Sequence, residues 1–271
     1  MSVSYSRSFV QIPRAGGTIE RPRLLAKLQS ALEYKLTLIS APPGYGKTTL
    51  AAQFASQVGF PVGWHTIEER DRDVPNLFEQ CVAALSRIVP SIKTLKPIQG
   101  GSATELAALI ANHLRENLKN DIILIFDDVQ NLAGSPSAET WLRTLVQFLP
   151  SNCHLILISR MLPDLPLTEM IARREVLAIG QQELQFTPDE VQALAVKVLG
   201  LTQTTIDVPE LTSRLEGWPA GIILALYPLP SELERVMLSG GKGPEALFDA
   251  LANSMLYAQS PGLRDFLLDC S

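Results

Sequence analysis

The stretch LISAPPGYGKTTL, residues 38–50, constrains the fold more than any other part of the chain. An apolar run stops at a cluster of Pro and Gly, and an apolar pattern with helical spacing resumes after Gly-Lys-Thr-Thr. This order predicts a strand, a glycine-containing loop and a helix. The loop fits the pattern A/G-x-x-x-x-G-K-S/T, with Ala41 in the first place instead of the commoner Gly.

A loop of this kind is suited to a chain of phosphates. Because it lacks bulky side chains, successive backbone N–H groups can point at phosphate oxygens, and the helix that begins at Lys47 adds its free N–H groups and the positive end of its dipole. We expect Lys47 to reach the β- and γ-phosphates and the Thr48 hydroxyl to bind Mg²⁺. The alternative is a plain Pro/Gly turn with a solvated Lys47. The residues predicted to bind the nucleotide here are Pro43, Gly44, Tyr45, Gly46, Lys47, Thr48 and Thr49.

A second predicted strand ends in two carboxylates. The apolar run at 122–126 is followed by Asp127 and Asp128, and ligands in open α/β sheets bind at the carboxyl edge. We expect Asp127 to hold Mg²⁺ through water, since this ion keeps several waters. Asp128 is expected to orient or deprotonate the attacking water. A plain capping role for Asp128 stays open as the alternative.

A third predicted strand, 154–159, ends in Arg160. At the same edge its guanidinium would reach the γ-phosphate and report whether it is present. The alternative is a surface ion pair with Asp164 or Glu169. The predicted catalytic residues are thus Lys47, Asp128 and Arg160. No Glu stands beside Asp127, so we expect slow hydrolysis if Asp128 is the base.

Strand and helix patterns alternate over most of the chain, which predicts an α/β fold: a P-loop NTPase with a doubly wound, mostly parallel five-stranded sheet. The predicted strands are 36–40, 61–67, 121–126, 154–159 and 175–179. The predicted helices between them lie near 47–58, 75–88, 104–118 and 137–148.

From Thr187 onward the pattern is helical, and TPDE at 187–190 is a capping box with Pro at the first helical position. A small all-helical domain is therefore expected after the sheet. The predicted domains are an extension at 1–17, a nucleotide-binding domain at 18–183 and a helical domain at 184–258. The segment 259–271 begins a helix that is cut short, and the family resemblance described below implies that it is the start of a truncated winged-helix domain.

Composition narrows the class of function. The net charge is −5, and no Lys/Arg cluster exceeds a local pair or triplet, which disfavours nucleic-acid binding by this chain itself. No apolar run reaches the roughly 18 residues of a membrane span, and the N-terminus lacks the apolar core of a signal peptide. The three cysteines are too few and too scattered for a disulfide framework or zinc site. A cytoplasmic protein with reduced thiols and no membrane partner is expected.

Together these motifs resemble the STAND (signal-transducing) P-loop ATPases, and within them the MalT-like bacterial transcriptional regulators of LuxR/SARP type. The resemblance covers nearly the whole chain. The motifs that carry it are APPGYGKTT at 41–49, GWHTIEERDRD at 63–73, IILIFDDVQNL at 122–132, LILISRMLPDLPL at 155–167, and LQFTPDEVQAL with LEGWPAGIILAL across 184–226.

The resemblance implies two contacts to the nucleotide base. A Gly-x-Pro segment of the helical domain, here Gly217 to Pro219, would lie against the adenine, and a segment before the first strand would bring Arg21 to the base. From the residues alone, Gly217 is a helix C-cap, Pro219 the first residue of the next helix, and Arg21 part of a helix start.

The resemblance also implies a function: a switch operated by ATP/ADP and Mg²⁺, closed with ADP and self-associating with ATP. It implies an unknown inducer acting through further C-terminal domains, and DNA bound only through an output domain. The segment SPGLRDFLLDCS at 260–271 would begin a winged helix. The alternatives are a conventional P-loop ATPase or kinase, although no Arg-rich lid follows the Asp pair, or a defence or cell-death regulator of the same superfamily.

Overall fold

The computed structural model describes residues 12–13, 18–197 and 207–226. The predicted extension at 1–17 lies almost wholly outside the described residues, and the predicted winged-helix start at 259–271 lies outside them entirely. The chain divides into two compact units. Among described residues, the first unit contains 12–13 and 20–184, and the second contains 18–19 and those from 185 onward.

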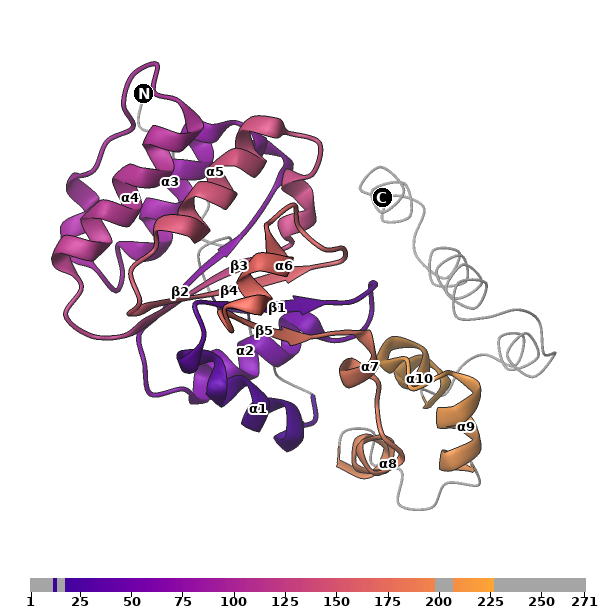
Figure 1. Cartoon of the computed structure of the whole chain (residues 1–271). Coiled ribbons are helices and arrows are strands. Elements are labelled where there is room, and N and C mark those ends of the chain that lie inside the picture. The colour runs from indigo at the N-terminus through magenta and orange to yellow at the C-terminus, as the bar shows by residue number, and fades with distance from the viewer. Residues whose placement is uncertain (1–11, 14–17, 198–206, 227–271) are drawn as a thin grey trace, which may run out of the picture. The chain divides into compact units, whose positions relative to one another are not determined.

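The first unit is built on a parallel sheet of five strands in the order β2-β3-β4-β1-β5 (Figure 1). The predicted α/β fold is confirmed, and every strand pair in this sheet is parallel. Each strand ends within one residue of its predicted bounds. The strands are β1 Leu36–Ser40, β2 Val62–Thr66, β3 Ile122–Asp127, β4 Cys153–Ser159 and β5 Val176–Ile179.

Helices cover both faces of this sheet, with α3, α4 and α5 on one face and α1 and α2 on the other (Figure 1). This covering explains why β3 and β4 are buried along their whole length and consist of near-continuous apolar runs. The helices of this unit are α1 Pro22–Gln29, α2 Lys47–Gln57, α3 Val74–Leu85, α4 Ala103–Asn117, α5 Pro136–Phe148, α6 Leu167–Ala172 and α7 Gln181–Leu184. Short 3₁₀ helices are η1 Ser30–Glu33, η2 Glu69–Arg72, η3 Pro90–Thr94 and η4 Val129–Leu132.

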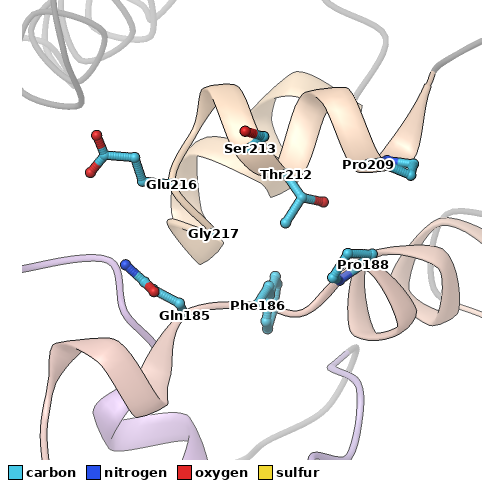
Figure 2. A pocket seen from close by; sticks show the side chains of 8 residues that line it. All are labelled: Gln185, Phe186, Pro188, Pro209, Thr212, Ser213, Glu216 and Gly217. Carbon is cyan, nitrogen blue, oxygen red and sulfur yellow. The ribbon is translucent and has the colours of Figure 1, made fainter.

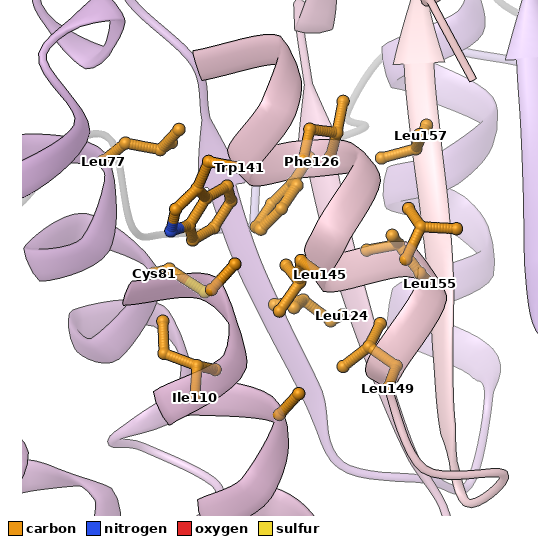
Figure 3. Packing of buried hydrophobic residues seen from close by; sticks show 14 of the residues in the cluster. Leu77, Cys81, Ile110, Leu124, Phe126, Trp141, Leu145, Leu149, Leu155 and Leu157 are labelled. Atoms are coloured by element: carbon orange, nitrogen blue, oxygen red, sulfur yellow. The ribbon is translucent and has the colours of Figure 1, made fainter. Parts of the chain in front are cut away.

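The main core lies between the sheet and α3–α5. Trp141 of α5 packs against Phe126 of β3, with ring centroids 6.3 Å apart (Figure 3). Two thiols, Cys81 and Cys153, are fully buried in the same cluster. Burial raises the pKa of Cys153 to about 12 and that of Cys81 well above its usual value. Both are therefore packing residues with little thiolate character.

The second unit is helical in its described part. It contains α8 Pro188–Lys197, α9 Val208–Arg214 and α10 Pro219–Leu226. The predicted capping box of α8 is confirmed, because Thr187 and Glu190 exchange side chain-to-backbone hydrogen bonds at 3.0 and 3.3 Å. A separate small core holds these helices, formed by Ile19, Phe186, Val191, Leu194, Ala195, Val208, Ile222 and Leu226. Within the described residues, no helix is long and apolar enough to cross a membrane.

Candidate nucleotide-binding site

The loop between β1 and α2 has the backbone of a phosphate cradle. Gly44 and Gly46 have φ values of 80° and 75°, in the left-handed region that glycine enters without a steric penalty. Gly46 is the N-cap of α2, so the helix presents its first free N–H groups to the loop. Ala41 donates its backbone N–H to the Ser159 carbonyl of β4 (3.3 Å). Ala41, at the first position of the loop motif, thus continues the hydrogen bonding between β1 and β4 by one residue.

Lys47 lies inside this loop. Its side chain is 9% exposed, and Nζ donates to the carbonyl oxygens of Ala41 and Pro42 at 2.7 and 3.0 Å. Burial, followed by the charge of Arg160, lowers the pKa of Lys47, while Asp128 and Asp127 oppose the shift. Among the described residues, the hydrogen-bond partners of this buried ammonium are neutral carbonyl oxygens, so phosphate oxygens would add a charge-assisted contact.

Thr48 and Asp127 meet at the end of β3. Thr48 Oγ1 donates to Asp127 Oδ1 at 3.2 Å, and the Asp128 N–H donates to the same oxygen at 2.9 Å. Asp127 is 2% exposed, and burial followed by the Asp128 charge raises its pKa to about 6. The described residues contain no group of three or more His, Cys, Asp or Glu placed to hold a metal ion. One hydroxyl and one carboxylate nevertheless fit Mg²⁺, which takes its other oxygens from water and phosphate.

Asp128 has an unusual backbone. With φ 54° and ψ 40° it is in the left-handed region, which costs a non-glycine residue about 1–2 kcal/mol. It occupies the N-cap position of η4, yet its side chain makes no capping hydrogen bond. Its carboxylate instead accepts from Gln130 Nε2 at 2.8 Å. Strain of this type is kept at functional sites, and the simple capping interpretation does not account for it.

Arg160 follows β4 at the same edge. The alternative ion pair with Asp164 is not present, because Asp164 pairs with Arg143 at 2.5 Å. Within the described part of the chain, no ion pair is formed by the Arg160 guanidinium, which is exposed. The charge of Arg160 contributes, after burial, to the lowered pKa of Lys47. The structure thus gathers Lys47, Thr48, Asp127, Asp128 and Arg160 at one end of the sheet.

The loop after β2 is fixed to this edge by contacts that sequence reasoning missed. Ile67 N–H donates to the Asp127 carbonyl at 2.8 Å, and Asn131 Nδ2 donates to the Ile67 carbonyl at 2.8 Å. His65 Nε2 lies 2.9 Å from Asp71 Oδ2, and both side chains are buried. The segment GWHTIEERDRD, residues 63–73, therefore contacts the end of β3 and the turn after it through hydrogen bonds.

Tyr45 and Arg21 contact α7 within the first unit. The Tyr45 side chain is 4% exposed, and its hydroxyl accepts from Gln181 Nε2 at 2.9 Å. The buried Arg21 guanidinium donates to the Leu184 carbonyl at 3.0 Å, and the Arg21 carbonyl accepts from the first turn of α1. The helix-start interpretation of Arg21 is thus confirmed, and its expected contact with the base stays a prediction.

Gly217 and Pro219 belong to the second unit, and Pro219 is the first residue of α10 as predicted. Gly217 closes the turn after α9, because its N–H donates to the Thr212 carbonyl at 2.8 Å with φ 65°. Beside it lies an open hollow of about 460 Å³, where Phe186 and Pro188 face Thr212 and Pro209 of α9 (Figure 2). Its lining is completed by Gln185, Ser213, Glu216 and Gly217.

The sheet order, the loop with its buried lysine and the Thr48–Asp127 pair define a P-loop nucleotide-binding domain. A family model described as "AAA domain" matches residues 32–166, the span that contains these features. Curated relatives named HTH-type transcriptional regulator MalT match 95% of the chain, at 30% identity in Yersinia pestis and 31% in Serratia proteamaculans. The chain spans 29% of the length of those relatives.

Among solved structures, a STAND protein with a tetratricopeptide repeat sensor from Pyrococcus horikoshii has a similar fold. The TM-score is 0.57 at 18% identity, over 94% of this chain and 39% of that one. The chain belongs to the MalT-like P-loop ATPases. The family assignment made from the sequence is thereby confirmed.

Proposed function

We propose that this chain is the ATP/ADP-operated switch of a signal-responsive transcriptional activator, with slow ATPase activity. The observation that carries the proposal is the Thr48–Asp127 hydrogen bond of 3.2 Å beside the buried Lys47. A hydroxyl, a carboxylate and an ammonium converge there on the mouth of a glycine loop, which is the arrangement that phosphates with Mg²⁺ need. The transcriptional part of the proposal is supported by the names of the relatives.

In this proposal the loop residues 43–49 bind the phosphates through backbone N–H groups and the Lys47 ammonium. Thr48, and Asp127 through water, would hold Mg²⁺, which would supply positive charge against the phosphate oxygens. Asp128 takes a proton from a water whose oxygen attacks the γ-phosphorus. The bond from that phosphorus to the bridging oxygen then breaks and ADP leaves. Arg160 contacts the γ-phosphate.

The switch is proposed to close with ADP, when Arg21 and Pro219 contact the adenine. Exchange for ATP, triggered by an inducer bound to other parts of the protein, would favour self-association, and DNA would be bound by an output domain. Slow turnover is expected because no Glu stands beside Asp127, which leaves Asp128 as the candidate base. Slow hydrolysis would make the ATP-bound state long-lived, as a switch requires.

The first test is the nucleotide that the purified chain carries. Denaturing the chain and separating the released small molecules shows whether ATP or ADP co-purifies, and added ATP then gives exchange and hydrolysis rates. Retained ADP with slow exchange supports the switch, whereas an empty site with rapid turnover refutes it in favour of a working ATPase.

The site itself is tested by Lys47→Ala, which should abolish nucleotide binding in titration calorimetry while circular dichroism stays native. Lys93→Ala is the matched control, because Lys93 is an exposed lysine on η3. Unchanged affinity in Lys47→Ala would exclude this loop as the phosphate site.

A further inference from the structure

One side chain connects the ends of β3 and β4. Gln130, on η4, donates from Nε2 to Asp128 Oδ1 at 2.8 Å. Its Oε1 accepts the Arg160 backbone N–H at 3.0 Å and faces Ser159 Oγ at 3.4 Å. The same amide therefore binds a carboxylate with its donor end and a backbone donor with its acceptor end.

The orientation of this amide is fixed by its partners. A carboxylate can only accept and a backbone N–H can only donate, so the reversed amide would face a repulsive contact at both ends. Asp128 has left-handed φ and ψ. Asp enters that region more readily than most side chains because its short carboxylate can hydrogen-bond locally, and here Gln130 Nε2 holds the carboxylate at 2.8 Å.

We propose that Gln130 is a positioning residue that sets Asp128 and Arg160 relative to one another at the γ-phosphate. This inference rests on the proposed function of the site. The donor end of the amide orients the Asp128 carboxylate toward the attacking water. The acceptor end fixes the backbone from which the Arg160 guanidinium projects. Loss of the amide should leave the phosphate loop untouched, because no hydrogen bond joins Gln130 to residues 41–49 among those described.

Two variants separate the two ends of the amide. Gln130→Met keeps most of the volume and removes both contacts, whereas Gln130→Glu keeps an acceptor for the Arg160 N–H and loses the donor to Asp128. Gln147→Met is the matched control, because Gln147 is exposed at the end of α5. Each variant of the 271-residue chain is assayed for single-turnover ATP hydrolysis. Calorimetry gives its affinities for ADP and for a non-hydrolysable ATP analogue.

We expect Gln130→Met to slow hydrolysis about 10- to 100-fold, the range seen when a supporting hydrogen bond or the geometry of a site is lost. Its ADP affinity should stay within about twofold of native, and its preference for the ATP analogue over ADP should fall. Gln130→Glu should also hydrolyse slowly, yet it should keep the native preference. A general loss of structure would not slow hydrolysis in both variants while changing the nucleotide preference in Gln130→Met alone.

A double-mutant cycle completes the test. If Gln130 acts through Asp128, Gln130→Met should reduce the hydrolysis rate much less in a chain that already carries Asp128→Asn than in the native chain. Native turnover in Gln130→Met, or fully additive losses in the cycle, would overturn the proposal while leaving the nucleotide site intact. A native chain that binds no nucleotide would overturn the proposed function and this inference together.

Discussion

Gly217 offers a prediction whose magnitude follows from the structure. A Cβ at this position would lie 2.8 Å from Gln185 Cβ and 2.8 Å from the Phe186 carbonyl oxygen, at a φ of +65°. The left-handed backbone costs a side chain about 1–2 kcal/mol, and overpacking against neighbours that cannot retreat adds about 1–3 kcal/mol. Gly217→Ala should therefore destabilise the second unit by about 2–5 kcal/mol.

A glycine with the same backbone and open space provides the control. Gly134 has φ +79°, and no atom lies within 4 Å of the place that a Cβ would occupy there, so Gly134→Ala should cost only about 1–2 kcal/mol. Amide hydrogen exchange read by mass spectrometry gives the local opening free energy of each unit separately. Faster exchange in Gly217→Ala should be confined to α8, α9 and α10, which share the core of the second unit.

The two alanine variants thus isolate the steric contact from the backbone conformation. Equal losses for Gly217→Ala and Gly134→Ala would refute the argument that the Phe186 carbonyl excludes a side chain at Gly217. Phe186 N–H also donates to the Gly217 carbonyl at 2.7 Å. A shift of either segment to relieve the clash would weaken that bond, so relaxation of the turn carries its own cost.

Three further results are expected. Thr48→Val should remove the gain in ATP affinity that Mg²⁺ provides, so calorimetry with and without EDTA should give similar values. Cys81 and Cys153 should resist iodoacetamide at pH 8 until the chain is unfolded, as peptide mass spectrometry would show, because burial raises both thiol pKa values. Lys27 lowers the pKa of Glu183 below its usual 4.5; since this pair is partly exposed, Lys27→Met should cost less than about 1 kcal/mol at pH 7 in denaturant titrations. That loss should fade as pH falls from about 4.5 through the lowered folded value, because a depressed carboxyl pKa stabilises only the ionised state.

The strands and the phosphate loop were predictable because their signals are local. Parallel strands buried on both faces need continuous apolar runs, and 122–126 and 154–159 are runs of that kind. The loop needs glycines at fixed places, and Gly44 and Gly46 do have positive φ. Because the carboxyl ends of parallel strands lie at one edge of a sheet, Asp127 and Arg160 could be predicted to lie at the same edge without knowledge of the strand order.

Several of the contacts that sequence reasoning missed join segments far apart in the chain. Gln130 contacts Arg160 only because β3 and β4 are neighbours in the sheet, and no pattern around Gln130 marks that pairing. Arg21 reaches the Leu184 carbonyl across 163 residues. A polar side chain two residues after the Asp pair was the only local signal, and many surface glutamines share such a position.

The strand order determines how Arg160 would approach a γ-phosphate in the proposed site. Because β4 lies between β3 and β1, Arg160 leaves the sheet between the Asp127 carboxylate on one side and the loop that begins at Ala41 on the other. The Arg160 N–H is held by Gln130 of η4, the turn that follows β3, and the carbonyl of the preceding Ser159 accepts the Ala41 N–H. If Arg160 contacts the γ-phosphate as proposed, the expected movement is therefore a rotation of its side chain, with the backbone of residue 160 kept in place by Gln130.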